Sequence, residues 1–315
     1  MRLSAVKLLR EYDPALLVRD LKEVLSEPWE PERAYKDAGE RPLAATNWTG
    51  LALRTQGGDP LRTDPGGPGL LPFTPTRILE RTPHFQDVLD SLPMELRSVR
   101  LLRLGSGAEV GFHRDAHHGF DYGQIRLHIP IITNPDAIIE IGGVSHNWQP
   151  GTLWYGDFTL LHRLWNRGQS ERVHMVIDAL VNPAFLNLMP AELRNDLRTS
   201  HVIFNKERIT LPDSTLKAME CDFAMPTTLL STVAGAASKW AQINSDSVPS
   251  RLTTTYGNLT IEVMDEPFLS LVPTGTNTFR CEGWTDARFV RVDTDHIILG
   301  TRHGNKIREL RLAKA

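Results

Sequence analysis

The sequence predicts a mainly β protein with flanking helices, a central β-sandwich or barrel and a small C-terminal β-unit. Between residues 99 and 179, short β-rich runs are separated by glycine, asparagine and proline, and such regular spacing is typical of sandwiches and barrels. Alternation of apolar and polar residues returns after residue 249. At 315 residues the chain exceeds the usual size of one domain, which is roughly 100–150 residues, so more than one unit is expected.

The N-terminal part should supply a helix, a strand and a second, short helix. Asp13 and Pro14 are typical of an N-cap and a first helical residue, and leucine and valine recur at helical spacing after them. The run NWTGLALRTQGG at 47–58 predicts a strand that enters a turn, because its alternation ends in two glycines. A proline- and glycine-rich loop at 62–75 then precedes HFQDVLDSL, which should form the short helix.

Three segments follow from the pattern along the chain. Residues 1–185 should form the main β domain, whose central strands are expected to be RSVRLLRLG, EVGFHRD, QIRLHIPIIT, AIIEIGG, SHNWQ, GTLWYGD and RVHMVIDALV. Residues 186–248 lose this pattern and contain helix-compatible pieces such as PAELRNDLR, so we expect them to connect or buttress. Residues 249–315 should form about five short antiparallel strands.

Composition and charge exclude several classes of protein. Apolar residues make up 41% and charged residues 23% of the chain, as in an ordinary globular protein. The formal charge of -3 gives no electrostatic footprint for nucleic acid or an anionic membrane. Only Cys221 and Cys281 are present, without the paired spacing of a zinc or redox motif. The N-terminus lacks a secretory signal and no run approaches the ~20 apolar residues of a membrane span, so a cytoplasmic location is expected.

Histidines are concentrated in one part of the chain, and they suggest a metal site. Seven of the eleven lie between residues 113 and 174. Because successive strand side chains alternate faces, His113 and Asp115 can point to the same side, and His162 at the end of WYGDFTLLH could supply a third ligand. Two imidazoles and one carboxylate with open positions are typical of non-haem Fe(II) oxygenases. The HxD pattern alone favours a surface His-Arg-Asp turn, and the metal site depends on the context that follows.

Arg172 adds a second candidate site. It lies ten residues after His162, in the apolar strand RVHMVID, where an inward-facing arginine needs an anion. A guanidinium fork suits a carboxylate at the far end of a dicarboxylic acid. A solvated arginine or a structural salt bridge is the alternative interpretation.

The sequence resembles the aspartyl/asparaginyl β-hydroxylase family, including its bacterial proline-hydroxylase-like members. The resemblance is carried by four phrases in order, over roughly residues 97 to 183: VRLLRLGSGAEVGFHRD, IRLHIPIITNP, GTLWYGD and LHRLWNRGQSERVHMVID. NWTGLALRTQGG is similar to an upstream segment of the family, which extends the likeness over the first 185 residues. The resemblance implies a double-stranded β-helix, a jelly-roll or cupin-like core, and a dioxygenase that uses Fe(II), 2-oxoglutarate and O2.

Carried over residue by residue, the resemblance implies roles for six side chains. The implied iron ligands are His113, Asp115 and His162. Arg172 matches the partner of the distal carboxylate of 2-oxoglutarate, His128 matches a position beside the cosubstrate, and Arg126 matches one that meets the cosubstrate or a substrate carboxylate. For His128 and His174 a structural role in a strand is the alternative, and for His174 we expect the structural role.

The sequence also departs from parts of the family pattern. Asp115 supplies a carboxylate that some members lack, which argues against the halogenase variant of this chemistry. Gln124 stands where some members have an arginine that holds an acidic substrate, so an aspartyl-peptide substrate is not expected. His117 and His118 should be exposed loop residues near the mouth. The candidates for lining the substrate pocket, which core packing or solvation could also explain, are Trp48, Arg54, Asp121 and Trp165.

The function expected from these observations is 2-oxoglutarate-dependent hydroxylation of an unactivated carbon in an amino acid. The substrate would be a free amino acid, or one within a peptide or a natural-product intermediate, and the other products would be succinate and CO2. No nucleic-acid or membrane partner is expected, and the C-terminal unit could support an oligomer. Two alternatives are a cupin-like metal-dependent isomerase or hydrolase that does not use 2-oxoglutarate, and a noncatalytic binding module stabilised by a metal.

Overall fold

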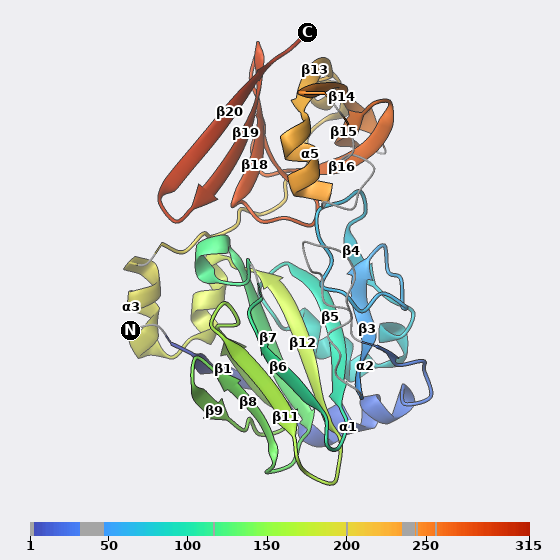
Figure 1. Ribbon diagram of the computed structural model, residues 1–315, viewed down its shortest axis with the longest axis vertical. Helices are drawn as coiled ribbons and strands as arrows, with labels where there is room; N and C mark the ends of the chain where they lie inside the picture. Colours follow the sequence, from blue (N-terminus) through green and yellow to red (C-terminus); the bar gives the residue numbers. More distant parts are fainter. Residues whose placement is uncertain are drawn as a thin grey trace. The chain divides into compact units, whose positions relative to one another are not determined.

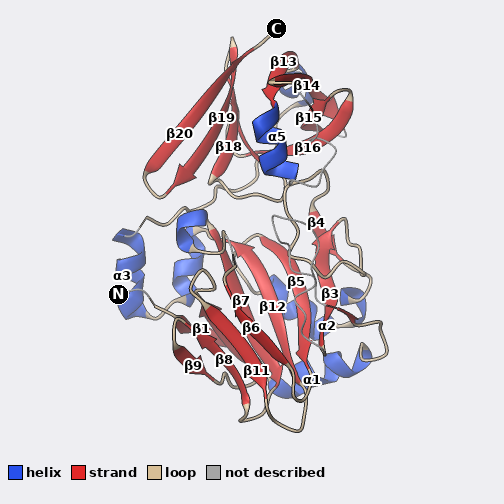
Figure 2. Ribbon diagram, in the orientation of Figure 1, coloured by secondary structure: helices blue, strands red, loops and turns tan. Residues whose placement is uncertain are grey.

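The computed structural model describes residues 3–31, 47–115, 117–199, 201–234, 243, 245–255 and 257–315 (Figures 1 and 2). Strands dominate these ranges, as predicted. The chain divides into two compact units. The first contains the described residues up to 204 except 67–72, and the second contains 67–72 and 205–315.

The first unit is built on two antiparallel sheets. The larger sheet has the order β1-β10-β7-β12-β5-β3-β2, with β4 paired to β3. Its strands are β1 (Ala5–Glu11), β2 (Glu30–Pro31), β3 (Trp48–Gln56), β4 (Phe73–Pro75), β5 (Leu96–Leu104), β7 (Gln124–Ile132), β10 (Thr152–Gly156) and β12 (Arg172–Leu180). The smaller sheet has the order β6-β11-β8-β9. Its strands are β6 (Glu109–His113), β8 (Ala137–Ile141), β9 (Val144–His146) and β11 (His162–Asn166).

The route of the chain between these sheets identifies the fold. From β5 to β12 the chain passes repeatedly from the larger sheet to the smaller and back, and its first and last strands, β5 and β12, are neighbours. This is the connectivity of a double-stranded β-helix, in which two four-stranded sheets face each other. The predicted jelly-roll core is therefore confirmed.

Helices cover the outer face of the larger sheet. In α1 (Pro14–Glu23) the Asp13 side chain accepts a hydrogen bond from Ala15 N at 2.8 Å, which confirms the predicted cap. The buried carboxylate of Asp20 accepts from His84 N and Phe85 N at 2.7 and 3.0 Å, and so joins α1 to the start of α2 (Pro83–Asp90). A short helix, η1 (Leu79–Arg81), precedes α2.

Alternation along the strands separates an apolar face from a polar one. On β7, Ile125, Leu127 and Ile129 belong to the apolar core that also includes buried residues of α1 and α2. The residues that alternate with them, Gln124, Arg126 and His128, therefore lie on the opposite face, which looks into the double-stranded β-helix. That polar inner face positions the candidate site.

Three short helices complete the first unit. These are η2 (Phe120–Tyr122) within the β6–β7 connection, and η3 (Pro183–Leu188) and α3 (Ala191–Thr199) after β12. Ile203 N donates to Phe120 O at 2.9 Å, so the chain up to 204 stays with this unit. None of the helices in the described ranges is long and apolar enough to cross a bilayer.

The second unit is an antiparallel meander whose strands follow chain order from β13 to β20. Its elements are α4 (Asp213–Lys217), β13 (Cys221–Pro226), α5 (Thr227–Ala234), β14 (Ser247–Thr255), β15 (Asn258–Val263), β16 (Glu266–Pro273), β17 (Thr278–Cys281), β18 (Arg288–Val292), β19 (His296–His303) and β20 (Lys306–Ala313). A bridge joins Phe223 to Lys314, and Ala315 N donates to Asp222 O at 2.9 Å. The last strand thus returns to the first, and the sheet nearly closes into a barrel.

The units divide at other places than the sequence pattern suggests. The expected boundary at 249 falls inside the second unit, because β13 pairs with β14 along its whole length. The proline- and glycine-rich loop also contributes to this unit, since Gly69 N donates to Glu282 O and Ser270 N donates to Gly69 O, both at 3.1 Å. About five strands were expected after residue 249, but β14 and β20 also belong to the sheet.

Candidate metal centre

Three predicted ligands lie together at one end of the smaller sheet. His113 is the last residue of β6, His162 is the first of β11, and the two are cross-strand partners. Asp115 N donates to Phe158 O at 2.9 Å, which holds the segment after β6 beside the loop that leads into β11. One ligand atom from each of the three residues lies within 4.8 Å of the other two. Strand pairing therefore creates the cluster.

Both histidines present the nitrogen that a metal needs. Nδ1 of His113 lies 2.8 Å from Gly111 O, and Nδ1 of His162 lies 2.9 Å from Leu160 O. Since a carbonyl oxygen only accepts, each Nδ1 carries a proton, and Nε2 is the nitrogen left to bind a metal. Burial lowers the pKa of His162 to about 4, against the opposing effect of Asp115, so the ring is neutral at pH 7. The donor set fits a divalent metal ion.

Asp115 is held as a carboxylate by a neighbouring arginine. Its Oδ1 lies 4.0 Å from Nε2 of His113, and its Oδ2 accepts a hydrogen bond from Nη1 of Arg126. Burial opposes ionisation, but the positive charge of Arg126, followed by smaller effects of His118, His162 and His113, lowers the pKa of Asp115. The carboxylate is thus ionised and ready to bind a cation.

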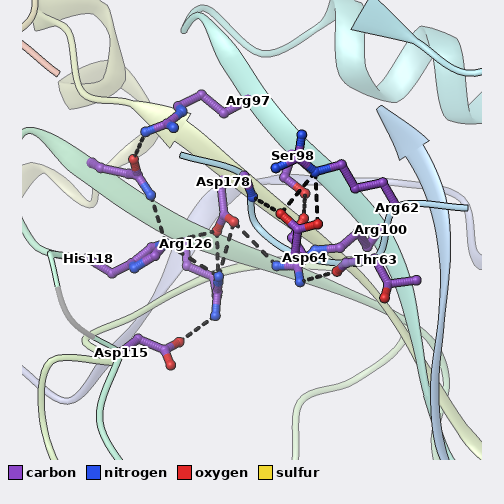
Figure 3. Close-up of polar contacts among 12 residues, drawn as sticks. Arg62, Thr63, Asp64, Arg97, Ser98, Arg100, Asp115, His118, Arg126 and Asp178 are labelled. Carbon is purple, nitrogen blue, oxygen red and sulfur yellow. Dashed lines mark hydrogen bonds and ion pairs between the residues drawn. The ribbon is translucent and has the colours of Figure 1, made fainter. Parts of the chain in front are cut away.

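Arg126 is fixed from the other side by Asp178 (Figure 3). Nε and Nη2 of Arg126 donate to the two carboxylate oxygens of Asp178 at 2.7 and 3.0 Å, a bidentate pair. Nη2 of the buried Arg100 lies 3.3 Å from Asp178 Oδ2, and its Nη1 donates to Thr63 O at 2.8 Å. Asp178 is fully buried; this burial raises its pKa, but the opposing charge of Arg126 and the His118 contact hold the pKa well below the usual value.

Asp178, which joins the arginines of this network, was not predicted from the sequence. A usable signal was present, because Arg172, His174 and Asp178 occupy alternate positions of an otherwise apolar strand and so share its inner face.

The polar network continues from Arg126 to the far end of β7. Gln124 Nε2 lies 2.7 Å from Nε2 of His118, and Arg97 Nη1 donates to Gln124 Oε1. The side chain of His118 is only 10% exposed, which corrects the expectation of a solvated loop residue. His117 is exposed as expected, and its ring meets Tyr122 edge-on. His118 is inward because it contacts the Arg126 and Asp178 pair.

Arg172 begins β12 and is buried, with 4% exposure. Its Nη2 lies 2.8 Å from Nδ1 of His174, and within the described ranges no carboxylate lies at ion-pair distance from it. Burial lowers the pKa of Arg172 to about 9, so the group is still protonated at pH 7. A buried cation without a counter-ion is unfavourable, and this site therefore fits an anionic ligand.

His128 lies beside this arginine and has an unsatisfied nitrogen. Its ring stacks on Phe158 at 5.0 Å between centroids, and its Nδ1 lies 3.4 Å from Nδ1 of His174. Nε2 of His128 is buried without a hydrogen-bond partner in the part of the chain that the structure describes. Burial, followed by the charge of Arg172, keeps the pKa of both histidines well below the usual value. His174 contacts Arg172 and His128, which agrees with a structural role.

The sequence model of the aspartyl/asparaginyl beta-hydroxylase family matches residues 14–181, more than half of the chain. The protein belongs to the aspartyl/asparaginyl β-hydroxylase family. Membership implies an oxygenase that uses Fe(II) and 2-oxoglutarate, and the His113, Asp115 and His162 cluster of this hydroxylase-family member fits the metal. The match ends one residue after β12.

Solved structures similar to this family member include two oxygenases and a predicted decarboxylase. A 2OG-Fe(II) oxygenase family oxidoreductase from Burkholderia pseudomallei is 16% identical, covering 56% of this chain and 84% of that chain with a TM-score of 0.37. The non-heme monooxygenase ThoJ in a nickel complex is 13% identical, covering 56% and 73% with a TM-score of 0.35. A predicted oxalate decarboxylase from Thermotoga maritima is 13% identical, covering 50% and 96% with a TM-score of 0.25. No curated protein matches the sequence.

The four predicted pocket residues of this hydroxylase-family member lie in different environments. Trp48 packs against the apolar cluster between the sheets, and its Nε1 is buried without a partner among the described residues. Arg54 donates to the carbonyls of Leu96 and Phe73 at 3.1 and 2.5 Å, contacts that tie strands together. Asp121 lies on η2. Trp165 lies under Arg163 on the face of β11 opposite to His162.

Proposed function

We propose that the protein is an Fe(II)- and 2-oxoglutarate-dependent dioxygenase that hydroxylates an unactivated carbon of an amino acid. The amino acid is free, or part of a peptide or natural-product intermediate, and succinate and CO2 are the other products. One observation carries this proposal: an open cluster of two histidines and one aspartate occurs in the same β-helix as Arg172, a buried arginine without a carboxylate partner in the described ranges.

In this proposal Nε2 of His113, Nε2 of His162 and a carboxylate oxygen of Asp115 hold the iron. A site with three protein ligands would stay accessible to a chelating cosubstrate and oxygen. Iron bound with 2-oxoglutarate supplies the oxidising power that inserts oxygen into a C–H bond. The backbone carbonyls of Gly111 and Leu160 orient the two imidazoles by accepting from their Nδ1 atoms.

Arg172 would bind the distal carboxylate of 2-oxoglutarate. Its guanidinium is protonated at pH 7 despite its lowered pKa, and His174 restricts its orientation from one side. His128, on the inner face of the neighbouring strand β7, offers its unsatisfied Nε2 next to the ring of Phe158. These buried groups form a dry surface on which a dicarboxylate gains the charge-assisted hydrogen bonds that water would otherwise weaken.

Arg126 contacts the candidate ligand Asp115, and it would orient a carboxylate of the substrate or the cosubstrate. Asp178 holds two of its nitrogens, which leaves Nη1 directed toward Asp115. A free amino acid carries a carboxylate that such a group recognises. This placement supports an amino-acid substrate.

The two alternatives explain fewer of these groups. A cupin-like isomerase or hydrolase would use the cluster but would leave Arg172 buried without a function. A noncatalytic metal-stabilised module favours a closed metal site with four protein ligands. The described residues supply three, so the open site supports catalysis.

The test is succinate formation from 2-oxoglutarate in air, with Fe(II) and a panel of free amino acids. Wild type should form succinate with one class of amino acid, and that amino acid should gain one oxygen atom in mass. Asp115→Ala should abolish both products, whereas Asp222→Ala, which removes an exposed carboxylate from the second unit, should leave them unchanged. Oxygen-independent conversion of a substrate without 2-oxoglutarate would contradict the proposal and favour the isomerase or hydrolase.

A second variant separates the cosubstrate site from the metal site. Arg172→Met should raise the KM for 2-oxoglutarate by about a hundredfold, because two charge-assisted hydrogen bonds are lost. Binding of Co(II), followed by its visible absorption, should persist in this variant and disappear in His162→Ala. An unchanged KM in Arg172→Met would show that the dicarboxylate binds elsewhere.

A further inference from the structure

The second unit contains a cavity of about 310 Å³ that the proposed oxygenase chemistry does not use. Its central wall is one row of inward-facing side chains, because Val290 pairs with Leu299 and Leu299 pairs with Leu310 across β18, β19 and β20. Leu229 of α5 and Phe268 of β16 also line the cavity. A volume of this size is at the lower end of the range for small-molecule sites in proteins, which is roughly 300–1,000 Å³.

The cavity is open at one end, and the rest of the barrel interior is filled by side chains. The barrel interior beside the apolar row is packed with fully buried residues such as Leu259, Leu271 and Phe279. Leu310, by contrast, faces the cavity and is 41% exposed. Eight-stranded barrels are just wide enough either to be filled by side chains or to hold one small ligand. The filled interior and the cavity of this barrel correspond to these two cases.

The open end carries a cationic rim. Arg288 pairs with Thr301, and Thr301 pairs with Arg308, so these three residues form the next row on the same inner face, two positions from the apolar row along each strand. The Arg288 guanidinium lies 4.4 Å from the ring centroid of Trp284. Arg308 is exposed and forms no ion pair with the described residues. Two guanidinium groups thus flank one hydroxyl.

Glu309 also lines the cavity, but its carboxylate is directed away from the rim. Glu309 precedes Leu310 on β20 and therefore points to the opposite face of the strand. There it pairs with Arg291 at 3.2 Å. The inner face of β18–β20 accordingly combines an apolar wall with positive charge at its mouth, and this combination is complementary to an amphiphilic anion.

We propose that the barrel of the second unit binds a small amphiphilic carboxylate, with its apolar body against Val290, Leu299 and Leu310. The carboxylate would accept hydrogen bonds from Arg288, Thr301 and Arg308. Neighbouring strands are about 5 Å apart, so two arginines on alternate strands can approach a single carboxylate from both sides. This site is independent of the metal cluster and of the proposed hydroxylation.

Isothermal titration of the full-length protein with decanoate tests the proposal, with decanol as the uncharged probe of equal length. We expect saturable one-to-one binding of decanoate, and binding of decanol that is weaker by about tenfold or more because the charge-assisted hydrogen bonds are missing. Equal affinity for the two probes would overturn the proposed recognition of the carboxylate. If neither probe bound, the proposed ligand site itself would be wrong.

Variants on one strand provide the matched control. Arg308→Gln should weaken decanoate binding by about tenfold and leave decanol binding unchanged. Arg311→Gln removes an exposed arginine from the outer face of the same strand and should have no effect. Equal losses in both variants would indicate nonspecific attraction of the anion and overturn the proposal.

Two further variants keep the result interpretable. Leu310→Trp should block binding of both probes without unfolding the barrel, which circular dichroism checks, because this position is 41% exposed. Asp115→Ala should bind decanoate like wild type. If Asp115→Ala lost decanoate binding, the ligand would occupy the metal-containing unit, and the proposed second site would be wrong.

Discussion

Asp178 is the side chain on which the inward-facing charges of the first unit depend. It is fully buried and contacts both Arg126 and Arg100. Removing one partner of a buried ion pair leaves an uncompensated charge, which costs about 3–5 kcal/mol. Asp178→Asn keeps the size of the side chain, so we expect a decrease of about 3 kcal/mol in the free energy of unfolding, measured by urea denaturation.

The control for Asp178 is an aspartate in an exposed pair. Asp222 contacts Arg251 at 2.5 Å on the surface of the second unit, where both side chains are 55% exposed. Solvent screens such a pair, and Asp222→Asn should change the stability little. Equal stability of wild type and Asp178→Asn would show that the two buried arginines are compensated by other contacts.

His174 should make the stability depend on pH. Burial, then the charges of Arg172 and His128, keep its pKa well below the usual value in the folded protein. The unfolded chain therefore binds more protons below about pH 6.5, and stability falls as the pH drops from there toward the lower folded pKa. The contribution of one such histidine is about 1.4 kcal/mol per pH unit within that window.

Replacement of His174 should reduce this slope. In chelator-treated protein, unfolding free energies at pH 6 and pH 5 should differ less in His174→Gln than in wild type, by about 1.4 kcal/mol. His296→Gln, which changes an exposed histidine at the start of β19, serves as the control and should keep the wild-type slope. A wild-type slope in His174→Gln would mean that His174 becomes protonated without loss of the fold.

The sequence predicted the metal cluster better than its surroundings, for a physical reason. The HxD spacing predicts that His113 and Asp115 point to the same side, although Asp115 follows the end of β6, and His162 lies at the start of a later strand of the same sheet. The inward packing of His118 was not predictable, because a loop residue is oriented by a tertiary contact, here with Asp178. Charges that satisfy one another across strands cannot be recognised from either strand alone.

At the scale of elements, the turn before β10 depends on one glycine. Gly151 has φ +80°, and a Cβ there would lie 2.3 Å from the backbone oxygen of Tyr12. Gly151 O accepts from Tyr12 N at 2.8 Å and Gly151 N donates to Pro130 O at 2.9 Å, so the turn cannot move away. We expect Gly151→Ala to lower the free energy of unfolding by about 3 kcal/mol, measured by urea denaturation.

A substitution at Gly143 measures backbone strain without a steric collision. Its φ of +83° is similar, but a Cβ there would meet nothing within 4 Å. Gly143→Ala should therefore cost only the backbone strain, about 1 kcal/mol. Equal effects of the two substitutions would show that the Tyr12 contact adjusts without cost.

The elements that the sequence did not predict share a cause. The strands of the double-stranded β-helix are apolar on one or both faces, and glycine, asparagine or proline bounds them, so their pattern is strong. β14 contains Pro249 and a run of threonines, and β20 is charged on both faces, so neither shows apolar alternation. Both strands form because their neighbours supply hydrogen bonds, which is tertiary information.

At the scale of the whole molecule, the two units have separate apolar cores. One core joins the larger sheet to α1 and α2, and another fills the meander from β13 to β20. The metal cluster belongs to the first unit and the amphiphile cavity to the second. A ligand stabilises the state that binds it by RT ln(1 + [L]/Kd), about 2.7 kcal/mol at a concentration of 100 Kd.

Hydrogen exchange should therefore report two independent responses. Co(II) with 2-oxoglutarate is expected to slow exchange in β6, β11 and β12, because their ends carry the proposed ligands, and to leave β14–β20 unchanged. Decanoate should slow exchange only in β18–β20. Asp115→Ala should lose the protection by Co(II) with 2-oxoglutarate and keep the protection by decanoate. Arg308→Gln should lose the protection by decanoate and keep that by Co(II) with 2-oxoglutarate. If either ligand protected both sets of strands, the two sites would be coupled, and the units would behave as one cooperative molecule rather than as separate binding bodies.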